Sequence, residues 1–229
     1  MKDAILERWE SACGRVRLFR GDAYQMVPSI QADALISDPP YGINFQHSGK
    51  SSKSAKWHRV NRRKIIGDNK PFNALPFVNF PFVALFGAEH FANQLKRGHL
   101  LSWDKRGTPP RGPKNNFIDA EFVWLNKRAS RNAVTHLWKG VCRDMAEEDK
   151  FGNKKRWHVS QKPVRVLRHL IEVAQLKPDS LIIDPFMGSG STAIAAMKSG
   201  HRFVGIDKSK VHFKTAKARV LAFLEEAAP

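Results

Sequence analysis

Cysteine is scarce in this chain, and long apolar runs are missing. Cys13 and Cys142 are the only two cysteines, and they do not form a CxxC pair. Structural zinc sites and disulfide frameworks need such spacings, so we expect neither, and no metal. The most apolar stretch, 74–92, is broken by two prolines, an Asn and a Glu, so no membrane span is expected. The charged first residues do not resemble a signal peptide, and we expect a soluble, cytoplasmic protein.

Acidic residues are also few. The chain has 39 Lys and Arg against 21 Asp and Glu, a net charge of +18, which favours a polyanionic partner such as nucleic acid. The segment 46–64 holds no acid and has no periodic apolar face, so we expect a mobile basic loop. Its candidate DNA-binding residues are Lys50, Lys53, Lys56, Arg59, Arg62, Arg63 and Lys64.

Hydrophobic patterning predicts an α/β protein of one domain, 1–229, with a polar loop at about 140–160. Strand patterns lie at 16–20, 32–37, 99–103, 120–126 and 133–139, and the last two alternate like antiparallel strands. Helical spacing is seen at 87–98. The last third predicts a βαβ unit with parallel strands: helix 163–176, strand 180–184, a helix ending at Gly200, strand 202–207 and helix 209–227.

The stretch DALISDPPYGINF, 33–45, carries an apolar run directly into Asp38-Pro39-Pro40-Tyr41. Two prolines fix φ and remove two backbone donors, which gives a stiff turn bearing a carboxylate and an aromatic ring. This segment alone leaves two interpretations open. It is either an ordinary strand-ending turn with a half-buried tyrosine or a built functional site.

A second constellation lies in the βαβ unit. A strand ends at Asp184, a turn containing Gly188 and Gly190 opens a helix, and the next strand ends at Asp207. Glycines let a ligand approach the backbone closely, and an acid after the second strand is placed to bind ribose hydroxyls. The turn lacks GK[ST] and is therefore not a Walker A loop. The pattern favours an adenosine-bearing cofactor.

Taken in order, LISDPPYGINF, LLSWDKR, AEFVWLNK, SQKPVRVLRHLIE and LIIDPFMGSGSTAIAAMKSGHRFVGIDKS resemble the S-adenosylmethionine-dependent DNA amino-methyltransferases, in the permuted group with DPPY before the glycine motif. The resemblance implies a circularly permuted, Rossmann-like fold, with a doubly wound, mostly parallel sheet and an antiparallel edge hairpin. It departs from the family at Val159, where a proline is usual, and at Asp207, where a glutamate is usual.

The resemblance also implies roles for individual residues. Asp38 and the Pro39 carbonyl would accept hydrogen bonds from the exocyclic amine of a base flipped out of the duplex, with Pro40 stiffening the turn and Tyr41 stacking on the base. Phe186 would line the pocket for S-adenosylmethionine, while Gln161 and Lys162 would cap its methionine end. The other implied cofactor-binding residues are Asp22, Pro163, Asp184, Gly188, Gly190, Ser191, Thr192 and Asp207. For Asp22 a plain turn role is equally open, and Asp68 matches the family without an evident role.

Several functional alternatives remain at this stage. Within the family, an aspartate before Pro-Pro-Tyr favours methylation of adenine N6 over cytosine N4. The expected partner is double-stranded DNA. A cytosine-N4 or RNA-directed enzyme, a non-catalytic DNA-binding protein with this fold, and a homodimer all stay open. A cytosine-C5 enzyme is disfavoured because neither cysteine lies in a motif. Trp103, Trp124 and Trp138 are expected in the core.

Overall fold

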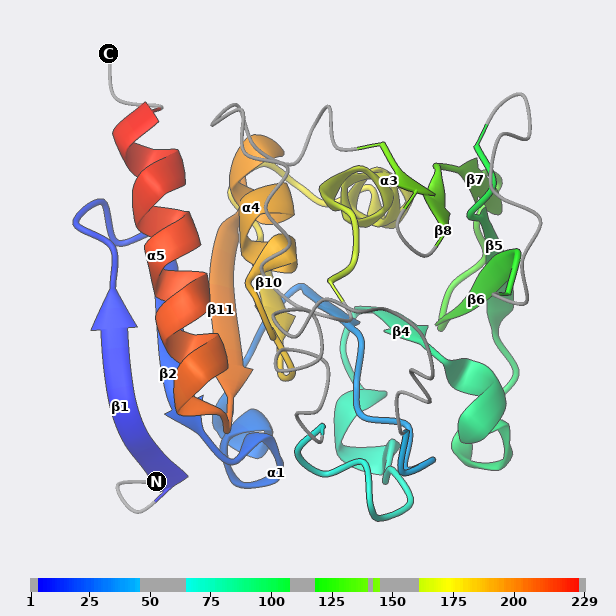
Figure 1. The fold of residues 1–229 in the computed structure, drawn as a ribbon, viewed down its shortest axis with the longest axis horizontal. Coiled ribbons are helices and arrows are strands. Elements are labelled where there is room, and N and C mark those ends of the chain that lie inside the picture. Colours follow the sequence, from blue (N-terminus) through cyan, green and yellow to red (C-terminus); the bar gives the residue numbers. More distant parts are fainter. Residues whose placement is uncertain (1–3, 46–64, 108–117, 140–141, 145–160, 227–229) are drawn as a thin grey trace, which may run out of the picture.

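One large sheet organises the molecule. The computed structural model describes residues 4–45, 65–107, 118–139, 142–144 and 161–226. In these residues nine strands form a sheet in the order β1-β2-β11-β10-β3-β4-β6-β5-β7 (Figure 1). Their bounds are Ile5–Glu10 (β1), Val16–Gly21 (β2), Ala34–Ser37 (β3), Phe82–Phe86 (β4), His99–Asp104 (β5), Ala120–Leu125 (β6), Ala133–Thr135 (β7), Leu181–Asp184 (β10) and Arg202–Asp207 (β11).

The central strands are parallel and the flanks are mixed. β2, β11, β10, β3 and β4 each run parallel to the next. At one edge β1 pairs antiparallel with β2, and on the other side β6 pairs antiparallel with both β4 and β5. The α/β class and the mostly parallel sheet are therefore confirmed. The hairpin at the edge is formed by β1 and β2, and β1 was not among the expected strands.

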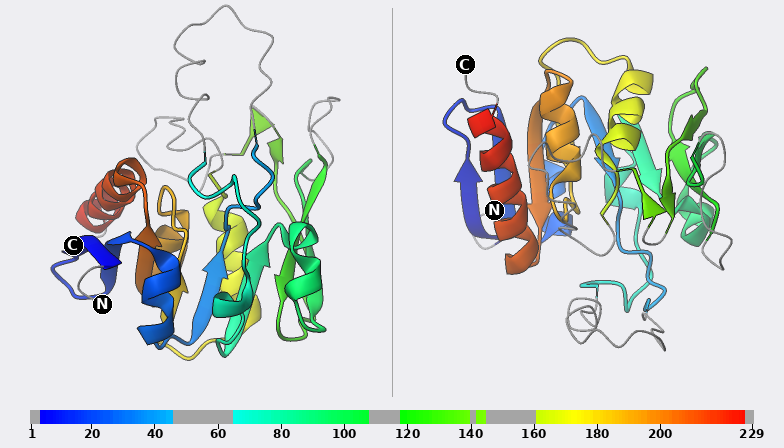
Figure 2. Two further views of the ribbon diagram at one scale, coloured as in Figure 1. Left: turned by 90° about the horizontal axis from the view of Figure 1, so that it is seen from below. Right: turned by 45° about the horizontal axis from the view of Figure 1, so that its top comes forward.

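Side chains alternate across the sheet and build a core on each face. Ile182 and Phe203 join the cluster beneath the long helices, whereas Ile183 and Val204 join the cluster on the opposite face. The long helices α3 (Val164–Ala174), α4 (Ser191–Lys198) and α5 (Lys210–Glu226) lie side by side over the first face (Figures 1 and 2). The second face is covered by shorter elements: α1 (Ala23–Met26) and the 3₁₀ turns Val27–Ser29, Leu75–Phe77, Ala88–His90 and Ala92–Gln94.

The expected helix over 87–98 is wrong. The chain makes two single 3₁₀ turns there, because the backbone opens at Phe91 (φ −140°) between them. Phe91 is buried, and the Gln94 amide bonds to Phe72 O and Ala74 N, so its polar groups are satisfied by another segment. Tertiary contacts override the local helical spacing.

The expected strand over 133–139 is also revised. β7 covers only its first part and pairs in parallel with β5 rather than antiparallel with β6. The chain then leaves the sheet: Trp138–Lys139 (β8) pairs with Cys142–Arg143 (β9) in a separate two-stranded sheet. The buried Trp138 indole donates to the Gln161 carbonyl (3.0 Å), which holds this segment against the turn before α3. Trp103, Trp124 and Trp138 are all buried, as expected.

Candidate functional site

Four aspartates gather along one edge of the sheet. Asp22 and Asp38 directly follow β2 and β3, while Asp184 and Asp207 are the last residues of β10 and β11. These strands are mutually parallel, so their carboxyl ends share an edge, which is where open α/β sheets bind ligands. The two sequence constellations, almost 150 residues apart, therefore meet in space: Ser37 donates to Asp184 at 2.6 Å.

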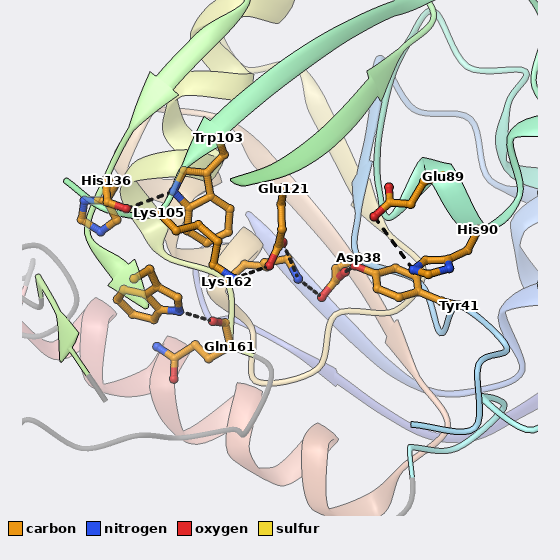
Figure 3. A network of polar contacts seen from close by, with 11 residues as sticks. Asp38, Tyr41, Glu89, His90, Trp103, Lys105, Glu121, His136, Gln161 and Lys162 are labelled. Atoms are coloured by element: carbon orange, nitrogen blue, oxygen red, sulfur yellow. Dashed lines mark hydrogen bonds and ion pairs between the residues drawn. The ribbon is translucent and has the colours of Figure 1, made fainter. Parts of the chain in front are cut away.

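The Asp38 carboxylate is held from two sides (Figure 3). Its Oδ1 accepts the Tyr41 hydroxyl at 2.5 Å, and its Oδ2 accepts Lys162 Nζ at 2.7 Å. Lys162 also lies 3.4 Å from Glu121 Oε2. Burial opposes the charged form of Lys162, but the carboxylates of Asp38 and Glu121 outweigh it and raise the pKa of Lys162 above its ordinary range. The lysine therefore remains a cation beside Asp38.

Residues Gly87 and His90 set the position of the Tyr41 ring. The ring stacks on the His90 imidazole, with ring centroids 4.9 Å apart and an interplanar angle of 22°. A Cβ on Gly87 would lie 2.1 Å from Tyr41 Cε1, so only glycine leaves room for the ring, and its φ of +67° is also one that glycine favours. Burial, then the charge of Asp38, raises the pKa of Tyr41 well above its usual value, so its hydroxyl stays a donor.

Asp68 fastens the chain that follows Tyr41. Its buried carboxylate accepts the backbone N–H groups of Gly42 (2.8 Å), Ile43 (3.3 Å) and Phe45 (2.6 Å), and its carbonyl accepts that of Asn44 (2.7 Å). A carboxylate that accepts several N–H groups fixes a loop strongly. The structure thus gives Asp68 the role that the sequence left without an explanation.

Asp184 supports the turn from within. Its Oδ2 accepts the Thr192 hydroxyl (2.6 Å), and its Oδ1 accepts the Ser37 hydroxyl and the Phe186 N–H (3.0 Å). Burial raises the pKa of Asp184 to about 6, against the lowering effect of these hydrogen bonds. The expected cofactor-binding residues Asp184 and Thr192 are both buried and bonded to each other.

A buried arginine braces the same turn from α5. Arg219 Nη1 lies 3.0 Å from the Ser189 carbonyl and 3.1 Å from the Ser191 hydroxyl, so Ser191 also bonds within the protein. Ser191 and Arg219 are buried. The glycine turn is therefore rigidly supported from beneath.

Asp207 and Asp22 occupy the neighbouring strand ends. Asp207 accepts the N–H groups of Gly188 (3.0 Å) and Ser209 (2.7 Å). Asp22 caps α1 through Tyr24 N (3.0 Å), which confirms a turn role, and Lys208 Nζ lies 3.1 Å from its other oxygen.

The backbone at Gly188 is uncrowded. A Cβ on Gly188 would meet nothing closer than Phe186 O at 3.9 Å. The Phe186 ring borders the turn and contacts an aromatic cluster whose other members are Tyr24, Phe72 and Phe77. An uncrowded glycine, an aromatic side chain and a strand-end acid are the kinds of residue that fit the adenosine part of S-adenosylmethionine.

The remaining predicted residues divide into placed and undescribed ones. Gln161 is buried beside Trp138, and Pro163 precedes the first turn of α3. All seven candidate DNA-binding residues, from Lys50 to Lys64, lie outside the described residues, as do the expected basic loop and most of the polar loop. In the part of the chain that is described, no cluster of three His, Cys, Asp or Glu residues could hold a metal ion, and no helix is long and apolar enough to cross a membrane.

Sequence reasoning missed Glu121, Lys105, His90 and Gly87. Glu121 lies in β6, and its Oε1 accepts Lys105 Nζ at 2.6 Å (Figure 3). From the sequence alone, the acid in AEFVWLN is expected to face solvent, because the pattern does not show in which direction this strand runs in the sheet. The antiparallel direction of β6 places its first residues at the edge where the parallel strands end.

Comparisons with known proteins agree with this arrangement. The N6/N4 methylase model, described as DNA methylase, matches residues 83–218. The type II methyltransferase M2.LlaDCHI of Lactococcus lactis subsp. cremoris is 38% identical, over 89% of this chain and 88% of the relative. The type II methyltransferase M2.DpnII of Streptococcus pneumoniae is 43% identical over a shorter match, which covers 38% of this chain and 30% of that protein.

Solved structures share the fold. The M1.HpyAVI–SAM complex superposes with a TM-score of 0.54 at 19% identity, covering 90% of this chain and 98% of that one. The PvuII DNA methyltransferase, cytosine-N4-specific, gives 0.58 at 12% identity, covering 94% and 89%. Together with the family match, these findings identify the chain as a member of the N6/N4 DNA methylases, the S-adenosylmethionine-dependent DNA amino-methyltransferases.

Proposed function

We propose that this DNA methyltransferase acts on the exocyclic N6 of an adenine flipped out of double-stranded DNA. The observation that carries the proposal is the Asp38 carboxylate, fixed after β3 by hydrogen bonds from Lys162 and Tyr41. Within the family, aspartate rather than serine before Pro-Pro-Tyr favours adenine. The target amine is buried in the base stack of a duplex, so the base has to leave the stack first.

Asp38 and the Pro39 carbonyl act on the amine. An exocyclic amino group is a poor nucleophile because its lone pair is delocalised into the ring. Two acceptors that hold its hydrogens favour a more tetrahedral nitrogen, with the lone pair directed at the methyl group. Pro39 and Pro40 hold these acceptors in place before the base arrives, so little reorganisation is needed in the transition state.

Tyr41 provides the stacking surface for the base. Its ring is already oriented by Gly87 and His90, and its hydroxyl occupies one Asp38 oxygen. The incoming amine can donate to the same Asp38 oxygen, because a carboxylate oxygen has a second lone pair. Aromatic stacking of this kind is worth about 1–3 kcal/mol per base.

The cofactor lies on the side of β10 and β11. We assign its contacts to the Gly188–Gly190 turn, Phe186, Asp207 and Asp22, with Gln161, Lys162 and Pro163 at the methionine end. When bound, S-adenosylmethionine supplies a methyl group made electrophilic by its positive sulfur. Asp184, Ser191 and Thr192 support the turn from beneath, in keeping with their internal hydrogen bonds.

We assign phosphate contacts to the basic segment 46–64. Counterion release makes such binding salt-dependent, with a slope of about −0.9 per phosphate neutralised on duplex DNA. Replacing Arg59, Arg62, Arg63 and Lys64 by Ala should therefore flatten the salt dependence of DNA affinity and leave cofactor affinity unchanged. Parallel log–log lines for the two proteins would exclude the contacts.

Nucleoside analysis tests the target atom. Duplex DNA is incubated with the protein and methyl-labelled S-adenosylmethionine, digested to nucleosides and analysed by mass spectrometry, with an RNA of the same sequence in parallel. The proposal expects the label in N6-methyldeoxyadenosine released from the DNA. Label in N4-methylcytosine would instead identify a cytosine-N4 enzyme, the specificity stated for the PvuII methyltransferase that shares this fold.

A further inference from the structure

Lys162 lies between two carboxylates that come from different parts of the sheet. Its Nζ is 2.7 Å from Asp38 Oδ2 and 3.4 Å from Glu121 Oε2. The other oxygen of Glu121 is 2.6 Å from Lys105 Nζ. The four side chains therefore form a line of alternating charge, Asp38, Lys162, Glu121 and Lys105, which Figure 3 shows running away from the Tyr41 ring.

The strand pairing fixes the position of Glu121. In the antiparallel pair of β5 and β6, Glu121 lies opposite Trp103. Trp103 precedes Lys105 by two residues, so Glu121 and Lys105 are near neighbours across the two strands. Lys162 arrives from the segment before α3, and its ammonium lies 5.1 Å from the centre of the buried Phe86 ring. Side-chain exposures of 17% for Glu121 and 13% for Lys162 leave little solvent to screen their charges.

Glu121 is held in its ionised form. Burial opposes its charge, but Lys162 and Lys105 outweigh that effect and lower the pKa of Glu121. The carboxylate therefore balances one of two neighbouring cations. Without it, Lys162 would have Asp38 as its remaining anionic neighbour in the network.

We propose that Glu121 is a positioning residue for methyl transfer: it holds Lys162, and through Lys162 it orients the Asp38 carboxylate and preserves its negative field at the target amine. The inference rests on the proposed function, in which Asp38 receives that amine. Glu121 touches neither base nor cofactor in this account.

The charge balance of the reaction explains why this matters. The amine nitrogen forms a bond to the methyl carbon while the carbon–sulfur bond breaks and its electron pair stays on sulfur. The nitrogen therefore gains positive charge until one of its protons passes to solvent water. Without Glu121, Lys162 has only the Asp38 carboxylate as an anionic neighbour in this network, which weakens the negative field of Asp38 at the amine and disfavours the developing cation.

The first test compares Glu121→Gln with a matched control. Asp119→Asn also removes a carboxylate, two residues earlier, which pairs with Lys139 outside this network. Under single-turnover conditions with saturating cofactor, Glu121→Gln should slow methylation about ten-fold, within the range for residues of one salt-bridge network. Asp119→Asn should retain the wild-type rate, and calorimetry should give both variants unchanged affinity for S-adenosylmethionine. A wild-type rate for Glu121→Gln would overturn the proposal.

The second test asks whether Glu121 acts through Lys162. In a Lys162→Gln background, adding Glu121→Gln should change the rate by less than about two-fold, because the intermediary is gone. A further ten-fold loss would overturn the proposal. If Glu121→Gln alone does not fold, the comparison of Lys162→Gln with the double variant still tests the proposal, because the charges of the network cancel in the double variant. An active Asp38→Ala would refute the proposed function itself, whereas an inactive Asp38→Ala with additive Glu121 and Lys162 effects would refute only this inference.

Discussion

Lys162 Nζ lies 2.7 Å from Asp38 Oδ2, although the two residues are 124 positions apart in the sequence. The contact joins the segment before α3 to the Asp-Pro-Pro-Tyr turn after β3. A lysine expected at the methionine end of the cofactor thus also contacts the carboxylate proposed to receive the base. In the proposed function, the base and cofactor halves of the site share this charged residue, which is why its neighbour Glu121 matters.

The two glycines of the turn should respond differently to alanine. Both have positive φ, which costs a non-glycine residue about 1–2 kcal/mol. A Cβ on Gly188 would meet nothing closer than Phe186 O at 3.9 Å, whereas on Gly190 it would lie 3.0 Å from the Ala216 Cβ on α5. Gly188→Ala should fold but bind S-adenosylmethionine more weakly by calorimetry, and Gly190→Ala should show the larger drop in melting temperature. Unchanged cofactor affinity in Gly188→Ala would contradict the placement of the cofactor.

Asp68→Ala should loosen the loop that follows Tyr41. It removes the acceptor of three backbone N–H groups, at Gly42, Ile43 and Phe45, so these groups would bond to water instead and the loop would lose the charge-assisted hydrogen bonds that hold it. Amide hydrogen exchange at these positions should accelerate, and methylation should slow while cofactor affinity is kept. Exchange rates equal to those of the wild type would show that Asp68 does not hold the loop.

Asp184 predicts a specific pH dependence of stability. Its pKa is about 6 in the folded protein against 3.8 for an unperturbed aspartate. An acid with a raised folded pKa favours folding below its unfolded pKa, and this contribution is lost as the pH rises through the folded pKa. Relative to Asp184→Asn, the free energy of unfolding of the wild type should fall by about 2 kcal/mol between about pH 4 and about pH 7. Denaturant titrations of both proteins across this range measure it, and a constant difference would be inconsistent with a buried, ionising Asp184.

The sequence correctly predicted the elements in which hydrophobic periodicity and tertiary packing favour the same structure. The βαβ unit from Val164 to Glu226 follows its periodicity closely, and the four strand-end acids lie on one edge because parallel strands place them there. The expected helix at 87–98 failed because Phe91 and Gln94 are satisfied by distant segments. Glu121 was missed because its role depends on strand direction, which a single strand pattern does not encode.

The partners of the Asp-Pro-Pro-Tyr turn were harder to foresee. Gly87 and His90 serve Tyr41 only through tertiary contact, and nothing in their own neighbourhood of the sequence indicates an aromatic ring above them. Asp68 was visible as a family match, but its three backbone partners come from the other side of the basic segment. Motif residues are thus readable from the sequence, while the residues that hold them need the fold.

Asp38→Ala, measured for methyl transfer and for cofactor binding in the same preparation, tests the central claim most directly. The carboxylate is proposed to address the target amine, and the glycine turn lies on the other side of the site. Single-turnover methylation of duplex DNA should therefore be lost, while calorimetry should show largely unchanged affinity for S-adenosylmethionine. Near-normal methylation by Asp38→Ala would contradict the account.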